Sequence, residues 1–237
     1  MSTIIHPQSV PVAHVSTDLP AIAATQLTPY ALRQRFAHPP EWQPELRQEP
    51  SYMTREPAQA AVLIGLTAPA HEPNNLHVLL TQRGQHLSTH SGQIAFPGGK
   101  VDASDASVQA AALREAHEEI GLPPERVQVI GQLPTYITGS AFWVQPVVAL
   151  VQPGEPLVPN PDEVDEVFEV PLSFLMNPAH HRLHRMEFEG VQRQWYSMPY
   201  LQPAQPQAIE RFIWGATAGM LRNLYRFLQA PLPVTRA

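Results

Sequence analysis

The stretch GGKVDASDASVQAAALREAHEEIGL, residues 98–122, decides the fold of this chain. Its second part predicts a helix over residues 106–120. Ser104 or Asp105 can serve as N-cap for the first turn, and Gly121 can take the left-handed conformation that ends a helix. The stretch therefore predicts a glycine turn that leads directly into a well-bounded helix.

Three glutamates share one face of this helix. Glu115, Glu118 and Glu119 fall within about a 100° arc, opposite the apolar side chains that face the core. Like charges at these spacings repel by roughly 0.2–0.5 kcal/mol per pair, and Arg114 alone cannot neutralise three carboxylates. Oxygen ligands at this density suit Mg²⁺ or Mn²⁺. Taken alone, however, the pattern is more typical of a solvated acidic face.

The segment in front of the helix favours the metal site. A short strand over residues 93–96 ends at Pro97, and Gly98 and Gly99 follow it. Glycines permit close approach of the backbone, so amides and carbonyls at this turn can face a metal and phosphate oxygens held by the helix. A plain turn is the alternative for the two glycines considered by themselves.

Apolar, β-branched and aromatic runs predict the remaining strands. These lie at residues 60–66, 77–82, 127–133, 142–151, 164–170 and 195–200. Two amphipathic helices are predicted at 28–36, with Thr28 as cap, and at 209–229, where Phe212 and Trp214 are assigned to core packing. The predicted class is α+β, an α/β/α sandwich with a mixed central sheet flanked by helices.

The chain is predicted to hold one main domain with extensions. Residues 1–55 form an N-terminal arm that carries the short helix and is partly mobile, because residues 1–26 are rich in Pro, Ser, Thr, Ala and His without periodicity. Residues 56–230 form the main domain, and 231–237 form a tail. A length of 237 residues with 43% hydrophobic content suits this division.

Composition limits the partners. The formal net charge of −6 argues against a nucleic-acid backbone as ligand. The chain has no cysteine, which excludes disulfides and thiolate metal sites. Apolar runs are far too short to span a bilayer, and the N-terminus lacks the pattern of a secretion signal. These features predict a soluble cytoplasmic protein with a small-molecule substrate, and they leave homodimerisation open.

The glycine turn and acidic helix together resemble the Nudix box. That pattern runs Gly, five residues, Glu, seven residues, then Arg-Glu-apolar-any-Glu-Glu-any-Gly-apolar. The matching residues are Gly99, Arg114, Glu115, Ala116, Glu118, Glu119, Gly121 and Leu122. Two departures stand out. The spacing from Gly99 to Arg114 is one residue longer, and no Glu stands in the middle, where Asp102 or Asp105 is the nearest acid.

An adjoining stretch is similar to the signature of the coenzyme A diphosphatase subgroup. That signature runs Leu-Leu-Thr-any-Arg-Ser-any-any-Leu-Arg, three residues, Gly, three residues, Phe-Pro-Gly-Gly. The matches are Leu79, Leu80, Thr81, Arg83, Leu87, Gly92, Phe96, Pro97, Gly98 and Gly99. Gly84 replaces Ser and Ser88 replaces Arg, so one expected cation for the substrate is missing.

The resemblance implies a role for each site residue. The implied metal ligands for Mg²⁺ or Mn²⁺ are Glu115, Glu119, Glu118 and the Gly99 carbonyl. The implied catalytic residues are Glu118, which is a ligand or acts on the water, Arg114, which orients a glutamate, and Glu163 of the acidic loop 160–166. Substrate contacts are implied for Arg83, Thr81, Phe96 and Gly98. The alternatives are a solvated loop for Glu163, a surface ion pair for Arg83, and a metal ligand or a loop cap for Asp102.

The implied activity is hydrolysis of coenzyme A or acyl-coenzyme A to 3′,5′-ADP and (acyl-)4′-phosphopantetheine. Other nucleoside diphosphate derivatives, such as ADP-ribose, NADH or a dinucleotide, are the alternative among Nudix hydrolases. A non-catalytic Nudix-fold module that binds a nucleotide is the alternative from a different functional class. His180, His181 and His184 suggest a transition-metal site, but with arginines beside them and no acid between they predict a polar surface instead.

Overall fold

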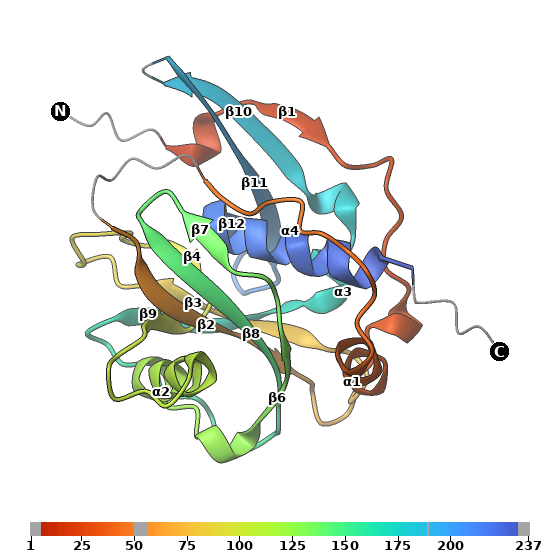
Figure 1. The fold of residues 1–237 in the computed structure, drawn as a ribbon, viewed down its shortest axis with the longest axis vertical. Coiled ribbons are helices and arrows are strands. Elements are labelled where there is room, and N and C mark those ends of the chain that lie inside the picture. Colours follow the sequence, from red (N-terminus) through yellow and green to blue (C-terminus); the bar gives the residue numbers. More distant parts are fainter. Residues whose placement is uncertain (1–5, 50–55, 189, 232–237) are drawn as a thin grey trace.

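The computed structural model describes residues 6–49, 56–188 and 190–231. Within these residues the strands form two sheets (Figure 1). The larger sheet has the order β4-β3-β2-β8-β6, with β5 paired to β2, β7 to β8 and β9 to β3. Its strands are β2 (Ala58–Thr67), β3 (His77–Arg83), β4 (Ile94–Ala95), β5 (Gly98–Lys100), β6 (Val127–Gln132), β7 (Tyr136–Thr138), β8 (Phe142–Val151) and β9 (Val164–Pro171).

The smaller sheet has the order β1-β10-β11-β12, and all its pairs are antiparallel. Its strands are β1 (Val12–Val15), β10 (Arg182–Phe188), β11 (Val191–Gln202) and β12 (Ile209–Trp214). The larger sheet is mixed, because β2 and β8 run parallel while β2 and β3 run antiparallel. The predicted α+β class with a mixed sheet between helices is therefore confirmed.

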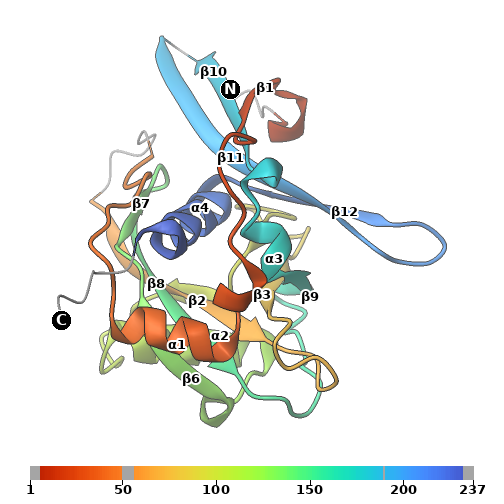
Figure 2. The ribbon, with the colours of Figure 1, turned by 90° about the vertical axis from the view of Figure 1, so that its right-hand side faces the viewer.

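Helices cover both faces of the larger sheet. They are α1 (Pro29–Ala37), α2 (Val108–Ile120), α3 (Leu172–Leu175) and α4 (Gly215–Gln229), with single 3₁₀ turns at Pro7–Ser9, Ala24–Gln26, Pro124–Arg126 and Pro178–His180. One core cluster joins α2 to the sheet through residues such as Ala61, Ala112 and Ala116, whose small side chains allow the helix to approach closely. Helix α4 lies over the opposite face, between the two sheets (Figure 2).

The two helix starts show how well local signals place an element. Thr28 caps α1 as predicted, since its hydroxyl accepts a hydrogen bond from the Ala31 amide at 3.2 Å. The N-cap of α2 is Ser107 rather than Ser104 or Asp105, with the Ala110 amide 3.1 Å from its hydroxyl. Gly121 ends α2 with φ of 65°, as predicted.

The C-terminal helix is shorter than predicted. Residues 209–214 form strand β12 and pair with β11, so Phe212 and Trp214 belong to a strand and not to the helix. The segment is rich in β-branched and aromatic residues, which suit a strand, and Gly215 has a left-handed φ of 63° where the helix begins. The apolar spacing over residues 209–214 fits a helix as well as a strand, so it does not distinguish the two.

The N-terminal arm is more closely packed than its composition predicts. Residues 12–15 form an edge strand on β10, and the side chains of Ile22 and Leu27 are buried in the core. The Ile22 amide also donates to the carbonyl of Met176 at 3.1 Å. These contacts join residues more than 150 positions apart, which local periodicity cannot reveal. The division of the chain into arm, domain and tail otherwise stays a prediction.

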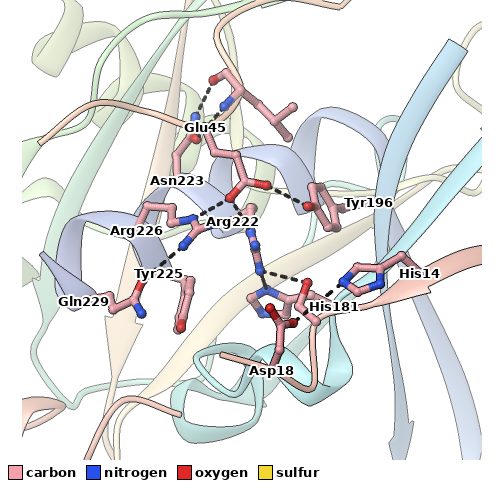
Figure 3. Close-up of polar contacts among 12 residues, drawn as sticks. His14, Asp18, Glu45, His181, Tyr196, Arg222, Asn223, Tyr225, Arg226 and Gln229 are labelled. Carbon is pink, nitrogen blue, oxygen red and sulfur yellow. Dashed lines mark hydrogen bonds and ion pairs between the residues drawn. The ribbon is translucent and has the colours of Figure 1, made fainter. Parts of the chain in front are cut away.

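A buried polar network ties this arm to α4 (Figure 3). Arg222, 2% exposed, donates to a Glu45 oxygen at 2.9 Å and to His181 Nδ1 at 3.0 Å. Glu45 also accepts from Arg226 and from the Tyr196 hydroxyl. The interpretation of the histidines as a polar surface is therefore wrong for His181, because this network pairs it inside the protein.

His184 is a second correction to that interpretation. Its ring is 2% exposed, with Nδ1 2.9 Å from the Val10 carbonyl and Nε2 2.8 Å from the Ser197 hydroxyl. It also stacks on Trp195, at 5.6 Å between ring centroids. Arg182 and Arg185 of the same strand are exposed, and Arg185, the next residue after His184, points to the opposite face of the sheet.

The His181 environment predicts acid sensitivity. Burial lowers the pKa of His181 to about 4, and the Arg222 charge acts in the same direction. The unfolded chain then binds more protons than the folded chain between pH 6.5 and 4, so stability falls as the pH is lowered through that window. We expect His181→Gln to remove about 2 kcal/mol of this loss, measured by urea unfolding at pH 6.5 and 4.5. An equal loss in both proteins, with His71→Gln as control, would contradict the assignment.

Candidate active site

Strand β5 places two glycines beside the acidic helix. Gly98 pairs with Val62 of β2 and has a φ of 154°, and a Cβ there would lie 2.3 Å from the Ala61 carbonyl oxygen. A Cβ on Gly99 would lie 2.5 Å from a carboxylate oxygen of Glu115. Gly98 is therefore required for the strand itself, whereas Gly99 leaves room for a functional side chain.

Glu119 is the most buried carboxylate of the helix. It is 4% exposed, so it does not belong to a solvated acidic face, which was the alternative for the helix taken alone. One oxygen accepts a hydrogen bond from the Gly98 amide at 3.0 Å, and the other lies 3.9 Å from Nη1 of Arg83. Burial raises the pKa of Glu119 to about 7 although these two donors oppose the shift. The site thus holds a carboxylate that is poorly compensated when charged.

Glu115 lies over Gly99 and is half-buried. Burial raises its pKa most, Arg114 opposes that shift, and the charges of Glu118 and Glu163 reinforce it. Glu163 also raises the pKa of Glu119. Glu163 of loop 160–166 is therefore close enough to both helix carboxylates for its charge to act on them, and its catalytic role stays a prediction. Glu118 is more exposed, at 52% of its side chain, and pairs with Arg114 at 2.9 Å.

Arg114 is held between two sets of acids. It donates to both oxygens of Asp105, at 3.0 and 2.9 Å, and to the Lys100 carbonyl at 3.1 Å. Its Nη1 then reaches Glu115 at 3.1 Å and Glu118 at 2.9 Å. The paired Asp105 raises the pKa of Arg114, and Arg114 in turn lowers the pKa of Asp105. This acid stands outside the glutamate cluster and fixes the arginine.

Sequence reasoning gave Asp105 no such role. The only local signal was its place as the nearest acid where the Nudix pattern has a middle Glu. Asp102, the other candidate there, lies 3.7 Å from Nη2 of Arg114 and is 63% exposed. Neither aspartate shows a contact with Glu115 or Glu119, so both serve the arginine in this structure.

The predicted substrate residues differ in their exposure. Thr81 is buried, and its hydroxyl donates to the Ala95 carbonyl at 3.2 Å, while Phe96 is 3% exposed and packs in the core. The structure does not bring these two side chains to the surface of the site. The Arg83 side chain is 29% exposed beside Glu119, and its buried Nε has no hydrogen-bond partner among the described residues. Gly98 presents only backbone.

The donor set fits a hard divalent cation. In the described part of the chain, no three acidic or histidine side chains converge as ligands. Oxygens of Glu115 and Glu119 are bonded instead by Arg114 and by the Gly98 amide. The carboxylates nevertheless raise each other's pKa in this partly buried site, and a bound cation would offset the repulsion between their charges. Oxygen donors suit Mg²⁺ or Mn²⁺ better than softer metals.

Comparison with known proteins agrees with this geometry. The family model described as NUDIX domain matches residues 57–209. The chain belongs to the Nudix family. Proteins named uncharacterized Nudix hydrolase NudL, from Salmonella dublin and Salmonella typhimurium, are each 42% identical over 180 residues, covering 76% of this chain and 87% of the relative. Like these relatives it is a Nudix hydrolase, and such enzymes generally use a divalent metal cation.

Solved Nudix structures overlap with part of the chain. A Nudix hydrolase from M. smegmatis, RenU, is 28% identical, with a TM-score of 0.43 over 52% of this chain and 78% of its own. A MutT/nudix family protein from Enterococcus faecalis is 20% identical, with a TM-score of 0.44 over 73% of this chain and 63% of its own.

Every helix in the described residues is too short or too polar to cross a lipid bilayer.

The two glycines give a test of this local structure. Gly98→Ala should destabilise the protein by more than about 2 kcal/mol, because its Cβ would meet backbone at a positive φ. Gly99→Ala should cost much less, since its Cβ meets only the movable end of Glu115. The measurement is the free energy of unfolding in urea. Equal losses for the two variants would contradict the assigned packing.

Proposed function

We propose that this Nudix hydrolase cleaves the diphosphate linkage of coenzyme A or acyl-coenzyme A, giving 3′,5′-ADP and (acyl-)4′-phosphopantetheine. The observation that carries the proposal is the proximity of Glu115, Glu119 and Glu163 to one another beside Gly98 and Gly99 of strand β5. The subgroup signature over residues 79–99 ends at these two glycines and supplies the substrate class by resemblance. A cluster of acids without a cation would repel a diphosphate, so it supports metal-dependent hydrolysis.

Each residue of the cluster has a chemical task in this proposal. Glu115, Glu119 and the Gly99 carbonyl would hold Mg²⁺ or Mn²⁺, with Glu118 as a further ligand. The cation supplies charge neutralisation of the diphosphate and makes water easier to deprotonate. Glu163, or Glu118, accepts the proton of the attacking water.

Two arginines complete the proposed arrangement. Arg114, fixed by Asp105, keeps the Glu115 and Glu118 carboxylates in place. Arg83 has a buried Nε without a hydrogen-bond partner among the described residues, and the partly exposed end of its guanidinium beside Glu119 suits contact with a substrate phosphate oxygen. Both arginines act by position and charge, which is what phosphoryl chemistry requires of a protein.

A second substrate class has one observation in its favour. Ser88 stands where the coenzyme A subgroup has an arginine, and an exposed serine cannot neutralise a further phosphate. ADP-ribose, NADH or a dinucleotide would need that cation less, because they lack the 3′-phosphate of coenzyme A. This alternative keeps the same metal and the same catalytic residues.

A substrate panel separates these proposals. With Mg²⁺ or Mn²⁺ and the full chain, coenzyme A should be cleaved with a kcat/KM well above those for ADP-ribose, NADH and diadenosine polyphosphates, as measured by product chromatography. Turnover of ADP-ribose without turnover of coenzyme A would overturn the substrate assignment. Nucleotide binding with no turnover on any substrate would favour a binding module.

Glu119→Gln tests the proposed metal ligand. We expect kcat/KM to fall by roughly 100-fold or more, because a neutral amide is a poor ligand for Mg²⁺. The fold should be retained, since the amide oxygen can still accept from Gly98 and no buried charge remains. The exposed Glu125→Gln is the matched control. Full activity of Glu119→Gln would exclude the assignment.

A further inference from the structure

Two loops meet beside the glutamate cluster. One is the start of loop 84–93, which follows β3, and the other is loop 160–166, which carries Glu163 and whose last three residues begin β9. The Gly84 amide donates to the Glu163 carbonyl at 2.9 Å, and the Gln85 amide donates to Asp165 Oδ2 at 3.0 Å. In a third contact between them, His86 Nε2 lies 3.1 Å from the Asp162 carbonyl oxygen.

The His86 ring reaches this carbonyl by folding back over Gly84. A Cβ on residue 84 would lie 2.5 Å from His86 Cε1 and 2.9 Å from Nδ1, too close for any side chain. Gly84 does not have a positive φ, so the backbone alone does not require glycine there. The coenzyme A diphosphatase pattern has serine at this position. In this chain the missing Cβ makes room for the ring.

Loop 160–166 is anchored at its other end on α2. The Asn160 amide donates to the Glu119 carbonyl at 2.8 Å, and the Glu163 and Val164 amides donate to the Asn160 carbonyl at 3.0 and 2.8 Å. Residues 161 and 162 are exposed and belong to no helix or strand. The His86 contact therefore falls on the exposed part of the loop, directly before Glu163.

We propose that His86, folded over Gly84, is a positioning residue that donates from Nε2 to the Asp162 carbonyl and so holds the Glu163 carboxylate facing Glu115 and Glu119. The effect on catalysis rests on the proposed function. The contact between His86 and the Asp162 carbonyl, called the clasp from here on, does not depend on it. A carboxylate that accepts a proton must stay within hydrogen-bond reach of the water, so a loosened loop lowers turnover more than substrate binding.

Two single variants break the clasp in different ways. His86→Ala removes the donor, and Gly84→Ala keeps the histidine but displaces its ring. In the full chain, with and without Mg²⁺, amide exchange of Gly84, Gln85 and residues 160–166 should rise roughly five- to tenfold in each variant. The double variant should exchange like either single one, because both changes remove the same contact. His86→Gln, which keeps an amide donor, should restore slow exchange in part.

Kinetics then test the consequence. The same variants should lose roughly tenfold in kcat with little change in KM, and the exposed His71→Ala should change neither rate nor exchange. Unchanged exchange of residues 160–166 in both His86→Ala and Gly84→Ala would overturn the clasp, and so would additive effects in the double variant. If exchange rises but Glu163→Gln keeps full kcat, the clasp stands and the proposed role of Glu163 fails.

Discussion

The site depends on one constraint, which is that α2 must hold Glu115 and Glu119 close to strand β5 without burying two uncompensated charges. The Gly98 amide satisfies one oxygen of Glu119, and Gly99 leaves space for Glu115. Small side chains of α2, such as Ala112 and Ala116, bring the helix close enough to the sheet for these contacts. The sheet, through its strand β5, and the helix therefore act as one unit.

The neighbouring charges show how the protein tolerates this arrangement. Arg114 neutralises Glu115 and Glu118 from one side, and Asp105 keeps the arginine in place. Arg83 lies 3.9 Å from Glu119 on the other side. Burial still keeps the pKa of Glu119 raised, so the compensation is incomplete. A site of this kind gains stability when a divalent cation binds, because a ligand that binds only the folded state stabilises it.

Much of this arrangement could be predicted from local sequence, because it is local structure. The cap at Thr28, the stop at Gly121 and the helix between residues 106 and 120 follow from short-range signals, and the structure changes the start of that helix by only a few residues. The glutamate face follows from helical geometry alone.

The rest depends on long-range pairing. Nothing in residues 12–15 indicates that they form an edge strand on β10. The buried hydrogen bond of His181 is likewise made with Arg222, far along the chain. Strand β12 was assigned to a helix because its apolar spacing fits both states until β11 is present to pair with it. The role of Asp105 likewise appears only when its distance to Arg114 is known.

The most direct test of the central claim is the anomalous difference density of a crystal of the full chain grown with Mn²⁺. The account predicts a peak at roughly 2 Å from carboxylate oxygens of Glu115 and Glu119 and from the Gly99 carbonyl oxygen. A peak at another site only, or no peak at a Mn²⁺ concentration that supports turnover, would contradict it.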